Sequence, residues 1–316
     1  MYNYTAFDLI FQSELPFREL LSTPYSLNHE YDITIKLGSV SPLGLNDSSP
    51  LKGVFYQVQS SALWLHVPNV ARFLVTNGQQ IVIDPLTKTD DDSIRLFVLG
   101  SCMGALLMQR NLFLLHGNAI KINDDHCISF VGNSGVGKST LSGALFRRGY
   151  SILADDICAI NTKGLVMPGF PQIKLCADSA QQLQIDTRPL KKIMPRAEKF
   201  AVPLGGQFNS VASELKMIYV LETHYQENIT ITPLVGIEKL NALQNNLYRK
   251  EYLNERERLF ACLKQCMQIG AQINLARITR PIKGFKLNEL VDVIESDLSE
   301  RGFMIKPVSS QLKEIS

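Results

Sequence analysis

The chain up to about residue 85 alternates between apolar and polar positions in the way that β-strands do. This alternation predicts short strands within residues 7–11, 31–37, 54–58, 63–67 and 71–83. The last run contains Asn77-Gly78 between ARFLVT and QQIVID, a pair that is typical of a tight hairpin whose turn needs positive φ. Residues 1–88 are therefore expected to form a β-rich N-terminal domain.

A helix over residues 89–111 is expected to link the two halves of the chain. Asp84-Pro85 ends the last strand, and the run from Thr89 to Asp92 supplies a cap and favourable negative charge for a helix N-terminus. The apolar stretch from Ile94 to Met108 contains Arg95 and is shorter than the roughly 20 residues that a bilayer requires. The pattern predicts a buried helix and no membrane span.

Residues 112–316 alternate strand and helix patterns, which predicts an α/β domain. The segment LFLLHGNAIKI indicates a strand, CISFV a second strand, and a glycine-rich loop then leads into a helix that ends before Gly149. Further strands are expected at 151–154, 217–222, 229–234 and 275–278, and helices at 252–269 and 287–298. Residues 186–206, rich in Pro, Gly and Lys, are expected to form a long connection, which is either a lid or substrate loop or irregular surface.

Composition places the chain among ordinary globular proteins. Of its 316 residues, 45% are hydrophobic and 20% charged, and the formal net charge of +2 gives no global field for nucleic acid or an anionic membrane. The six cysteines are scattered without metal-binding spacing, which indicates reduced thiols. The N-terminus lacks the pattern of a signal peptide, so a cytoplasmic location is expected.

The most specific motif is GNSGVGKS at residues 132–139, a complete GxxxxGKS phosphate-binding loop that directly follows an apolar strand. Its glycines allow successive N–H groups to point into one anion-sized hollow, and the following helix adds its positive end. Lys138 is expected to reach the β and γ phosphates and Ser139 to bind Mg²⁺. The residues expected to contact the nucleotide, ATP or GTP, are Gly132, Asn133, Ser134, Gly135, Val136, Gly137, Lys138, Ser139 and Thr140.

Two acidic residues, Asp155 and Asp156, follow the apolar strand SILA and are expected to emerge beside this loop. One carboxylate at such a position commonly helps to hold Mg²⁺, and a second is suited to accept the proton of an attacking hydroxyl. The alternative is that Asp156 only caps a helix or forms a turn.

His116 interrupts the apolar segment LLHGNAI, on a strand expected to run beside the one that feeds the loop. Gly117 gives close access there, so a catalytic or orienting role stands against the usual structural role of a lone histidine.

The segments LLHGNAI, FVGNSGVGKSTL and RRGYSILADD resemble, in order and spacing, the catalytic core of the HPr kinase/phosphorylase family, which transfers phosphate to a protein serine. Further segments, among them SELPFREL, RFLVTNGQQIVIDPL, GFPQIKL and LARITRP, are similar to the HPr-kinase-like proteins found with lasso-peptide biosynthesis enzymes. Those proteins modify a serine hydroxyl of a precursor peptide.

The resemblance implies a P-loop kinase core of the HPr kinase C-terminal type. It also implies that Lys138 contacts the transferred phosphate, Ser139 binds Mg²⁺ with Asp155 as the companion carboxylate, and Asp156 accepts the proton with support from His116. The chain departs from the family after Asp156, where no counterpart of the glutamate-containing signature follows. This departure argues against phosphorylase activity and against HPr as the substrate; Lys174, which stands in its place, either approaches the phosphates or lies on the surface.

The sequence therefore predicts a Mg²⁺-dependent kinase that transfers the γ-phosphoryl group of ATP or GTP to a serine hydroxyl of a peptide or protein, with a lasso-type precursor peptide as the favoured acceptor. Neither nucleic acid nor a membrane is expected as a partner, and the resemblance raises homo-oligomerisation because HPr kinases assemble into rings.

Three alternatives remain at this stage. One is a P-loop ATPase, hinted at by Leu204-Gly-Gly-Gln207, which is similar to an ABC-type signature but follows Asp156 in a Pro-rich segment. Another is a bifunctional HPr kinase/phosphorylase. The third is a nucleotide-controlled switch attached to an N-terminal binding module.

Overall fold

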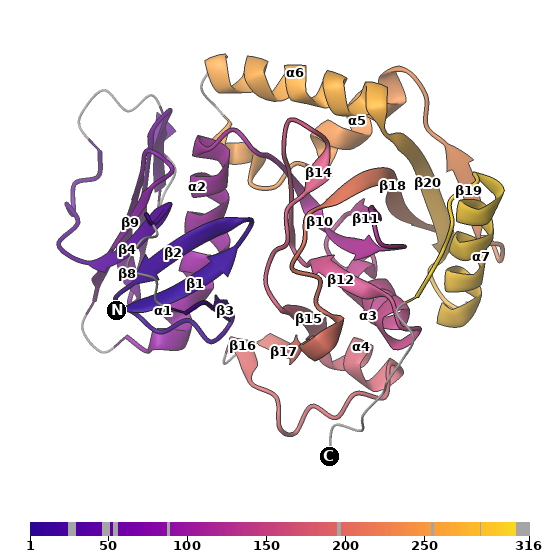
Figure 1. Ribbon diagram of the computed structural model, residues 1–316, viewed down its shortest axis with the longest axis horizontal. Helices are drawn as coiled ribbons and strands as arrows, with labels where there is room; N and C mark the ends of the chain where they lie inside the picture. Colours follow the sequence, from indigo (N-terminus) through magenta and orange to yellow (C-terminus); the bar gives the residue numbers. More distant parts are fainter. Residues whose placement is uncertain are drawn as a thin grey trace.

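The computed structural model describes residues 1–24, 30–45, 51–52, 56–86, 89–194, 197–253, 256–284 and 286–307 (Figure 1). Within this range the chain is a mixed α/β protein with two large sheets and a small one. Residues 54 and 55 of the strand expected at 54–58, residues 254 and 255 of the helix expected at 252–269, and the C-terminal residues from 308 lie outside it.

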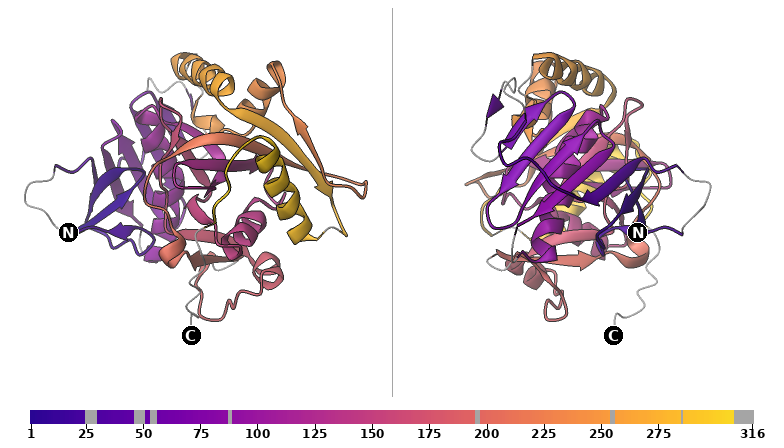
Figure 2. Two further views of the ribbon diagram at one scale, coloured as in Figure 1. Left: turned by 45° about the vertical axis from the view of Figure 1, so that its right-hand side comes forward. Right: turned by 90° about the vertical axis from the view of Figure 1, so that its left-hand side faces the viewer.

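The first sheet is formed entirely by residues 2–85, in the strand order β3-β1-β2-β4-β9-β8-β7-β6-β5. Figure 2 (right) shows it facing the viewer. Alternate side chains are buried along β8 and β9, as their apolar–polar alternation predicts. The strands are β1 (Tyr2–Ala6), β2 (Leu9–Ser13), β3 (Leu21–Ser22), β4 (Ile33–Leu37), β5 (Leu51–Lys52), β6 (Tyr56–Gln59), β7 (Ala62–Val67), β8 (Ala71–Thr76) and β9 (Gln80–Pro85).

Two turns of this sheet each contain two consecutive residues with positive φ, and the sequence predicted one of them. Asn77 and Gly78 adopt φ values of 54° and 62° between β8 and β9, which confirms the predicted hairpin. The continuous strand expected over residues 7–11 is wrong. Phe7 and Asp8 have φ values of 54° and 61° and form the turn between β1 and β2. Positive φ is uncommon for residues other than glycine, so the residue types at these two positions do not predict the turn.

The expected linking helix is present but is not continuous. It consists of α1 (Asp91–Phe97), a π-helical turn (Val98–Cys102) and α2 (Met103–Gln109), and the Asp90 side chain caps it by accepting a hydrogen bond from the Ser93 N–H at 2.8 Å. Most of its residues are buried, as expected from the apolar stretch. No helix in the described part of the chain has the length and hydropathy needed to cross a membrane.

The central sheet has β11, β18 and β20 running parallel, with β10 antiparallel to β11 and β19 antiparallel to β20. β12 and β13 pair with the other edge of β10, and the short β14 joins β13 to β18. These strands are β10 (Phe113–Lys121), β11 (His126–Gly132), β12 (Ser151–Ala154), β13 (Ile157–Ile160), β14 (Leu165–Val166), β18 (Ser213–His224), β19 (Thr230–Pro233) and β20 (Asn274–Pro281).

Helices cover both faces of the central sheet (Figures 1 and 2). Apolar residues of α3 (Lys138–Arg147) and α7 (Leu287–Glu300) pack on one face, and those of α5 (Ile237–Asn245) and α6 (Arg256–Gln272) pack on the other. The sequence predicted that this last helix starts at residue 252, but residues 250–252 form a separate 3₁₀ turn and α6 starts at Arg256. A helix covering each face is the arrangement that buries a parallel sheet.

Residues 186–206, expected as a long connection, contain two strands. β16 (Lys192–Met194) and β17 (Ala197–Pro203) form a small sheet with β15 (Gln172–Cys176) in the order β15-β17-β16, beside α4 (Ala177–Gln182). Leu204-Gly-Gly-Gln207 ends in a 3₁₀ turn whose Gln207 side chain donates to the Phe146 carbonyl at 3.0 Å. Cross-strand pairing outweighs the breakers of this segment, a context that local composition does not reveal.

The N-terminal sheet and the rest of the chain share one apolar core. The rings of Phe7 and Phe170 meet edge to face with centroids 5.2 Å apart, and the Phe7 N–H donates to the Pro168 carbonyl at 2.6 Å. Leu114, Ile157 and Met167 belong to the same buried cluster as the N-terminal strands. The first sheet is thus packed directly against the strands that carry the candidate site.

Gly117→Ala is expected to destabilise the protein by about 1–3 kcal/mol, because an added Cβ on β10 would lie 2.5 Å from the Phe130 carbonyl oxygen. Gly206→Ala is the matched control: its Cβ meets nothing within 4 Å, so we expect a change below about 0.5 kcal/mol. Urea unfolding of both variants measures the difference. Equal midpoints would contradict the close packing of β10 on β11.

Candidate functional site

β11 runs into a loop of residues 132–137 that becomes α3 at Lys138. Gly132, Gly135 and Gly137 have φ values of 143°, 81° and 104°, in the region that favours glycine. A Cβ on Gly132 would also lie 2.6 Å from the Leu221 carbonyl oxygen of the neighbouring strand. The glycine spacing is therefore needed for the path of this backbone, and the loop ends at the N-terminus of a ten-residue helix.

Lys138 is buried, and its ammonium group lies within the curve of the loop. Nζ donates to the carbonyls of Gly132 at 2.7 Å and Asn133 at 3.1 Å. Burial lowers its pKa, and the charges of Asp156 and Asp155 partly oppose that shift. The positive end of α3 and this ammonium group thus face the same small volume.

Asp155 and Asp156 interrupt what is otherwise one strand along β10. β12 ends at Ala154, opposite Ala119, and β13 starts at Ile157, opposite His116. Asp156 has a φ of 74°, and the Ile157 N–H donates to the Asp155 carbonyl at 2.9 Å. Such a break in a strand re-aims neighbouring side chains, and here it sends the two carboxylates in different directions.

The Asp155 side chain is buried and fully engaged. One carboxylate oxygen accepts from Asn118 Nδ2 at 2.6 Å, and the other accepts from the Lys174 N–H at 2.7 Å. Burial, followed by the nearby charge of Asp156, raises the pKa of Asp155 to about 6. Asp155 is not among the residues that line the site's cavity, so its direct neighbours are protein groups.

Asp156 does face the cavity and has two cationic or polar neighbours. Lys174 Nζ lies 3.0 Å from Oδ2, and His116 Nδ1 lies 3.4 Å from Oδ1. Burial works against the charge of Asp156, but the hydrogen bond and charge of Lys174, with help from His116 and Lys199, outweigh it and hold the pKa at about 2. Burial lowers the pKa of His116, and the neighbouring charge of Asp156 partly opposes that shift.

His116, Asp156 and the first residues of the loop line one cavity of about 390 Å³. It is lined by His116, Asp156, Gly132, Asn133 and Ser134, and by residues 245–251. The last segment lies along β10 through an isolated bridge between Leu115 and Leu247 and a hydrogen bond from the His116 N–H to the Asn246 carbonyl at 2.8 Å. The loop, the histidine and the second aspartate, which are far apart in the sequence, therefore surround one space.

Comparison with known proteins gives a partial likeness to solved structures. No protein-family model and no curated protein matches the chain. Among solved structures, the Hpr(Ser) kinase/phosphatase from Coxiella burnetii is similar at 15% sequence identity and a TM-score of 0.28, over 60% of this chain and 93% of that one. A TM-score of 0.28 describes a loose superposition, so the geometry of the site carries the functional case.

Two arginines at the site were not singled out from the sequence. Arg280, on β20, donates to the Val136 carbonyl at 2.7 Å, and a Cβ on Gly137 would lie 3.2 Å from its guanidinium. Arg249 lines the cavity with a φ of 48° and donates to Ser101 Oγ at 3.1 Å. Arg280 was detectable in principle, because β20 runs parallel to β11 and its carboxyl end lies at the same edge of the sheet as the loop. Arg249 follows a helix, and no local sequence pattern marks it.

Three further residues singled out in the sequence, Ser139, Thr140 and Lys174, differ in their contacts. Ser139 is half-buried in the first turn of α3. The Thr140 hydroxyl is 2.6 Å from Ser179 Oγ at α4, so it is engaged within the protein. Lys174, for which the sequence left two alternatives, lies against Asp156, and its own backbone holds Asp155.

The residues present fit a nucleoside triphosphate with Mg²⁺. The N–H groups of the first turn of α3 lack intrahelical partners and suit phosphate oxygens, and a Cβ on Gly135 or Gly137 would impose a strained backbone at the loop. The described residues contain no group of three or more His, Cys, Asp or Glu side chains placed to hold a metal. Mg²⁺ is commonly held by one or two protein ligands together with substrate phosphates and water, which Ser139 and an aspartate can provide.

Proposed function

We propose that this chain is a Mg²⁺-dependent kinase that transfers the γ-phosphoryl group of ATP or GTP to a serine hydroxyl of a peptide or protein. The observation that supports it most is the shared cavity, where the GNSGVGKS loop lies across from the ionised Asp156. Lys174 lies 3.0 Å from Asp156 Oδ2 and holds this carboxylate ionised, so that Asp156 is suited to accept a hydrogen bond from an acceptor hydroxyl.

In this proposal each residue has one task. The loop N–H groups, the N-terminus of α3 and Lys138 would hold the phosphates, and Ser139 with Asp155 would hold Mg²⁺, which would supply neutralising charge between phosphate groups. Asp156 accepts a hydrogen bond from the acceptor hydroxyl and aligns it with the phosphorus. Its low pKa keeps it ionised for that purpose at neutral pH. As the bond from the γ-phosphorus to the nucleoside diphosphate breaks and the bond to the hydroxyl oxygen forms, the hydroxyl proton passes late to Asp156.

Residues 1–88, 89–111 and 112–316 are proposed as the N-terminal domain, linking helix and catalytic domain. A precursor peptide of the lasso type is proposed as the acceptor on the sequence resemblance. The segment Leu204-Gly-Gly-Gln207 gives no support to the ATPase alternative. Its Gln207 side chain donates a hydrogen bond to the Phe146 carbonyl near the end of α3, and the segment does not line the cavity.

The decisive measurement is the destination of labelled γ-phosphate. Incubation with Mg²⁺, γ-labelled ATP or GTP and serine-containing peptides is expected to give labelled phosphoserine, with Lys138→Met as the control for contaminating kinases. Label found only as free phosphate would favour an ATPase. Absence of nucleotide binding by the unaltered chain would refute the proposal altogether.

A further inference from the structure

A second hollow of about 360 Å³ lies on the other side of the Lys174–Asp156 ion pair. It is a groove between the segment that contains Arg18 and Glu19, helix α1 and the small sheet. Its apolar lining includes Leu96, Leu99, Phe170, Pro171, Leu190 and Ile193. We call it the α1 groove.

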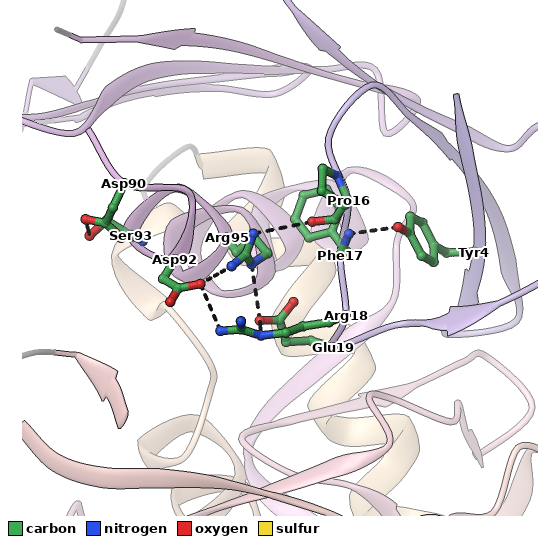
Figure 3. A network of polar contacts seen from close by, with 9 residues as sticks. All are labelled: Tyr4, Pro16, Phe17, Arg18, Glu19, Asp90, Asp92, Ser93 and Arg95. Carbon is green, nitrogen blue, oxygen red and sulfur yellow. Dashed lines mark hydrogen bonds and ion pairs between the residues drawn. The ribbon is translucent and has the colours of Figure 1, made fainter. Parts of the chain in front are cut away.

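One wall of the α1 groove is fixed by a network of polar contacts (Figure 3). Arg95, buried on α1, pairs with Asp92 and lies 3.3 Å from Glu19 Oε1, while Arg18 lies 2.8 Å from Asp92 Oδ1. The Phe17 N–H donates to the Tyr4 hydroxyl at 2.8 Å and ties the same segment to β1. These contacts neutralise Arg18 within the wall and leave a preformed, ordered surface.

The opposite wall is the small sheet, and it carries cations without ion-pair partners. β16 lies at the edge of this sheet, and Lys191 and Lys192 at its start are exposed. Among the described residues neither has an ion pair, although Asp90 and Asp92 line the adjoining hollow with them. Because Asp92 is paired with Arg18 and Arg95, and Glu19 with Arg95, the uncompensated charge at the groove is positive.

The α1 groove leads to the candidate site through a single residue. Lys174 lines the groove, its Nζ lies 3.0 Å from Asp156 Oδ2, and Asp156 lines the site cavity. Gln172, at the start of the same strand, lines the groove as well. A chain lying in the groove would therefore meet Lys174, which is paired with the carboxylate that the proposed transfer requires.

We propose that the α1 groove binds the acceptor as an extended peptide with acidic residues beside its serine. Its apolar lining suits alternate side chains, β16 as the edge strand of the small sheet suits a peptide backbone, and Lys191 and Lys192 complement carboxylates. This inference rests on the proposed kinase function, for which it names the place and charge of the acceptor. It also gives residues 16–20 and α1 a role in recognition.

The test uses the full chain and three fluorescein-labelled peptides of 12 residues, each with a central serine and the same apolar residues. Their remaining positions are Asp and Glu, Ser and Gln, or Lys and Arg. By fluorescence polarisation the acidic probe is expected to bind at least tenfold more tightly than the other two. Lys191→Glu/Lys192→Glu is expected to weaken that binding at least tenfold.

Lys36→Glu/Lys163→Glu is the matched control, since both residues are exposed, lie outside the groove and give the same change in net charge. It is expected to bind the acidic probe within about twofold of the unaltered chain. Equal binding of the three probes by the unaltered chain, or equal loss in the two double variants, overturns the groove as an acidic-peptide site. The unaltered chain supplies the first comparison even if a variant fails to fold.

A fluorescent ATP analogue separates failure of this inference from failure of the proposed function. Nucleotide binding with no preference for the acidic probe would refute the groove and leave the kinase proposal standing. Preference for the acidic probe without nucleotide binding would refute the kinase proposal and leave a peptide-binding groove.

Discussion

Asp156→Asn is expected to lower phosphoryl transfer at least 100-fold while nucleotide affinity changes by less than about threefold. The amide keeps the shape of the side chain but removes the charge that Lys174 and His116 surround. An amide also accepts the hydroxyl hydrogen bond more weakly and takes up no proton. Because Asp156 is not part of the loop that holds the phosphates, the loss should fall on transfer and not on nucleotide binding.

The measurement compares the rate of labelled phosphoserine formation with the affinity for a fluorescent ATP analogue. Asp124→Asn is the control, since Asp124 is paired with Lys306 at 3.7 Å but its side chain is 85% exposed on the 123–126 turn. Its transfer rate is expected to stay within about twofold of the unaltered chain. Transfer by Asp156→Asn at the unaltered rate would exclude Asp156 as the aligning carboxylate.

The sequence predicted best those features that depend on short stretches of chain. The Asn77-Gly78 hairpin follows from backbone states that few residues adopt, and the loop that starts at Gly132 follows from the same limitation. The Asp90 cap likewise acts within three residues. In each case the physical cause is local, so a local pattern is sufficient.

Features that depend on distant partners were missed or left open. β16 and β17 exist because they pair with each other and with β15, although their segment is rich in breakers. Arg249 reaches the site only because residues 246–248 lie along β10. The two alternatives for Lys174 could not be separated in the sequence, since the choice depends on where β15 places it relative to Asp156.

The different surroundings of the two aspartates could not be read from their adjacency either. The sequence suggested a division of labour, and the structure adds a physical basis for one. Asp156 faces the cavity, while Asp155 turns inward to Asn118 and to the backbone of Lys174. Asp155 therefore connects β10 to the middle of β15 and fixes the strand break that aims Asp156.

Asp155→Ala is expected to reduce the free energy of unfolding by about 2–4 kcal/mol, because it leaves two donors unpaired. Asn118 Nδ2 is buried, and the Lys174 N–H is partly so, with bonds to Asp155 of 2.6 and 2.7 Å. Relief from burying a carboxylate, whose pKa burial raises to about 6, offsets part of this loss. Asp155→Asn keeps one acceptor oxygen, so its loss should be smaller.

Urea unfolding without Mg²⁺ or nucleotide isolates this structural contribution of Asp155 from any role in metal binding. Asp124→Ala serves as the control and is expected to unfold within about 0.5 kcal/mol of the unaltered chain, since its side chain is 85% exposed. An Asp155→Ala variant as stable as that control would show that the two hydrogen bonds contribute nothing net. Asp155 would then remain only as a candidate ligand of Mg²⁺, and the aim of Asp156 would have to be set by its contacts with Lys174 and His116 alone.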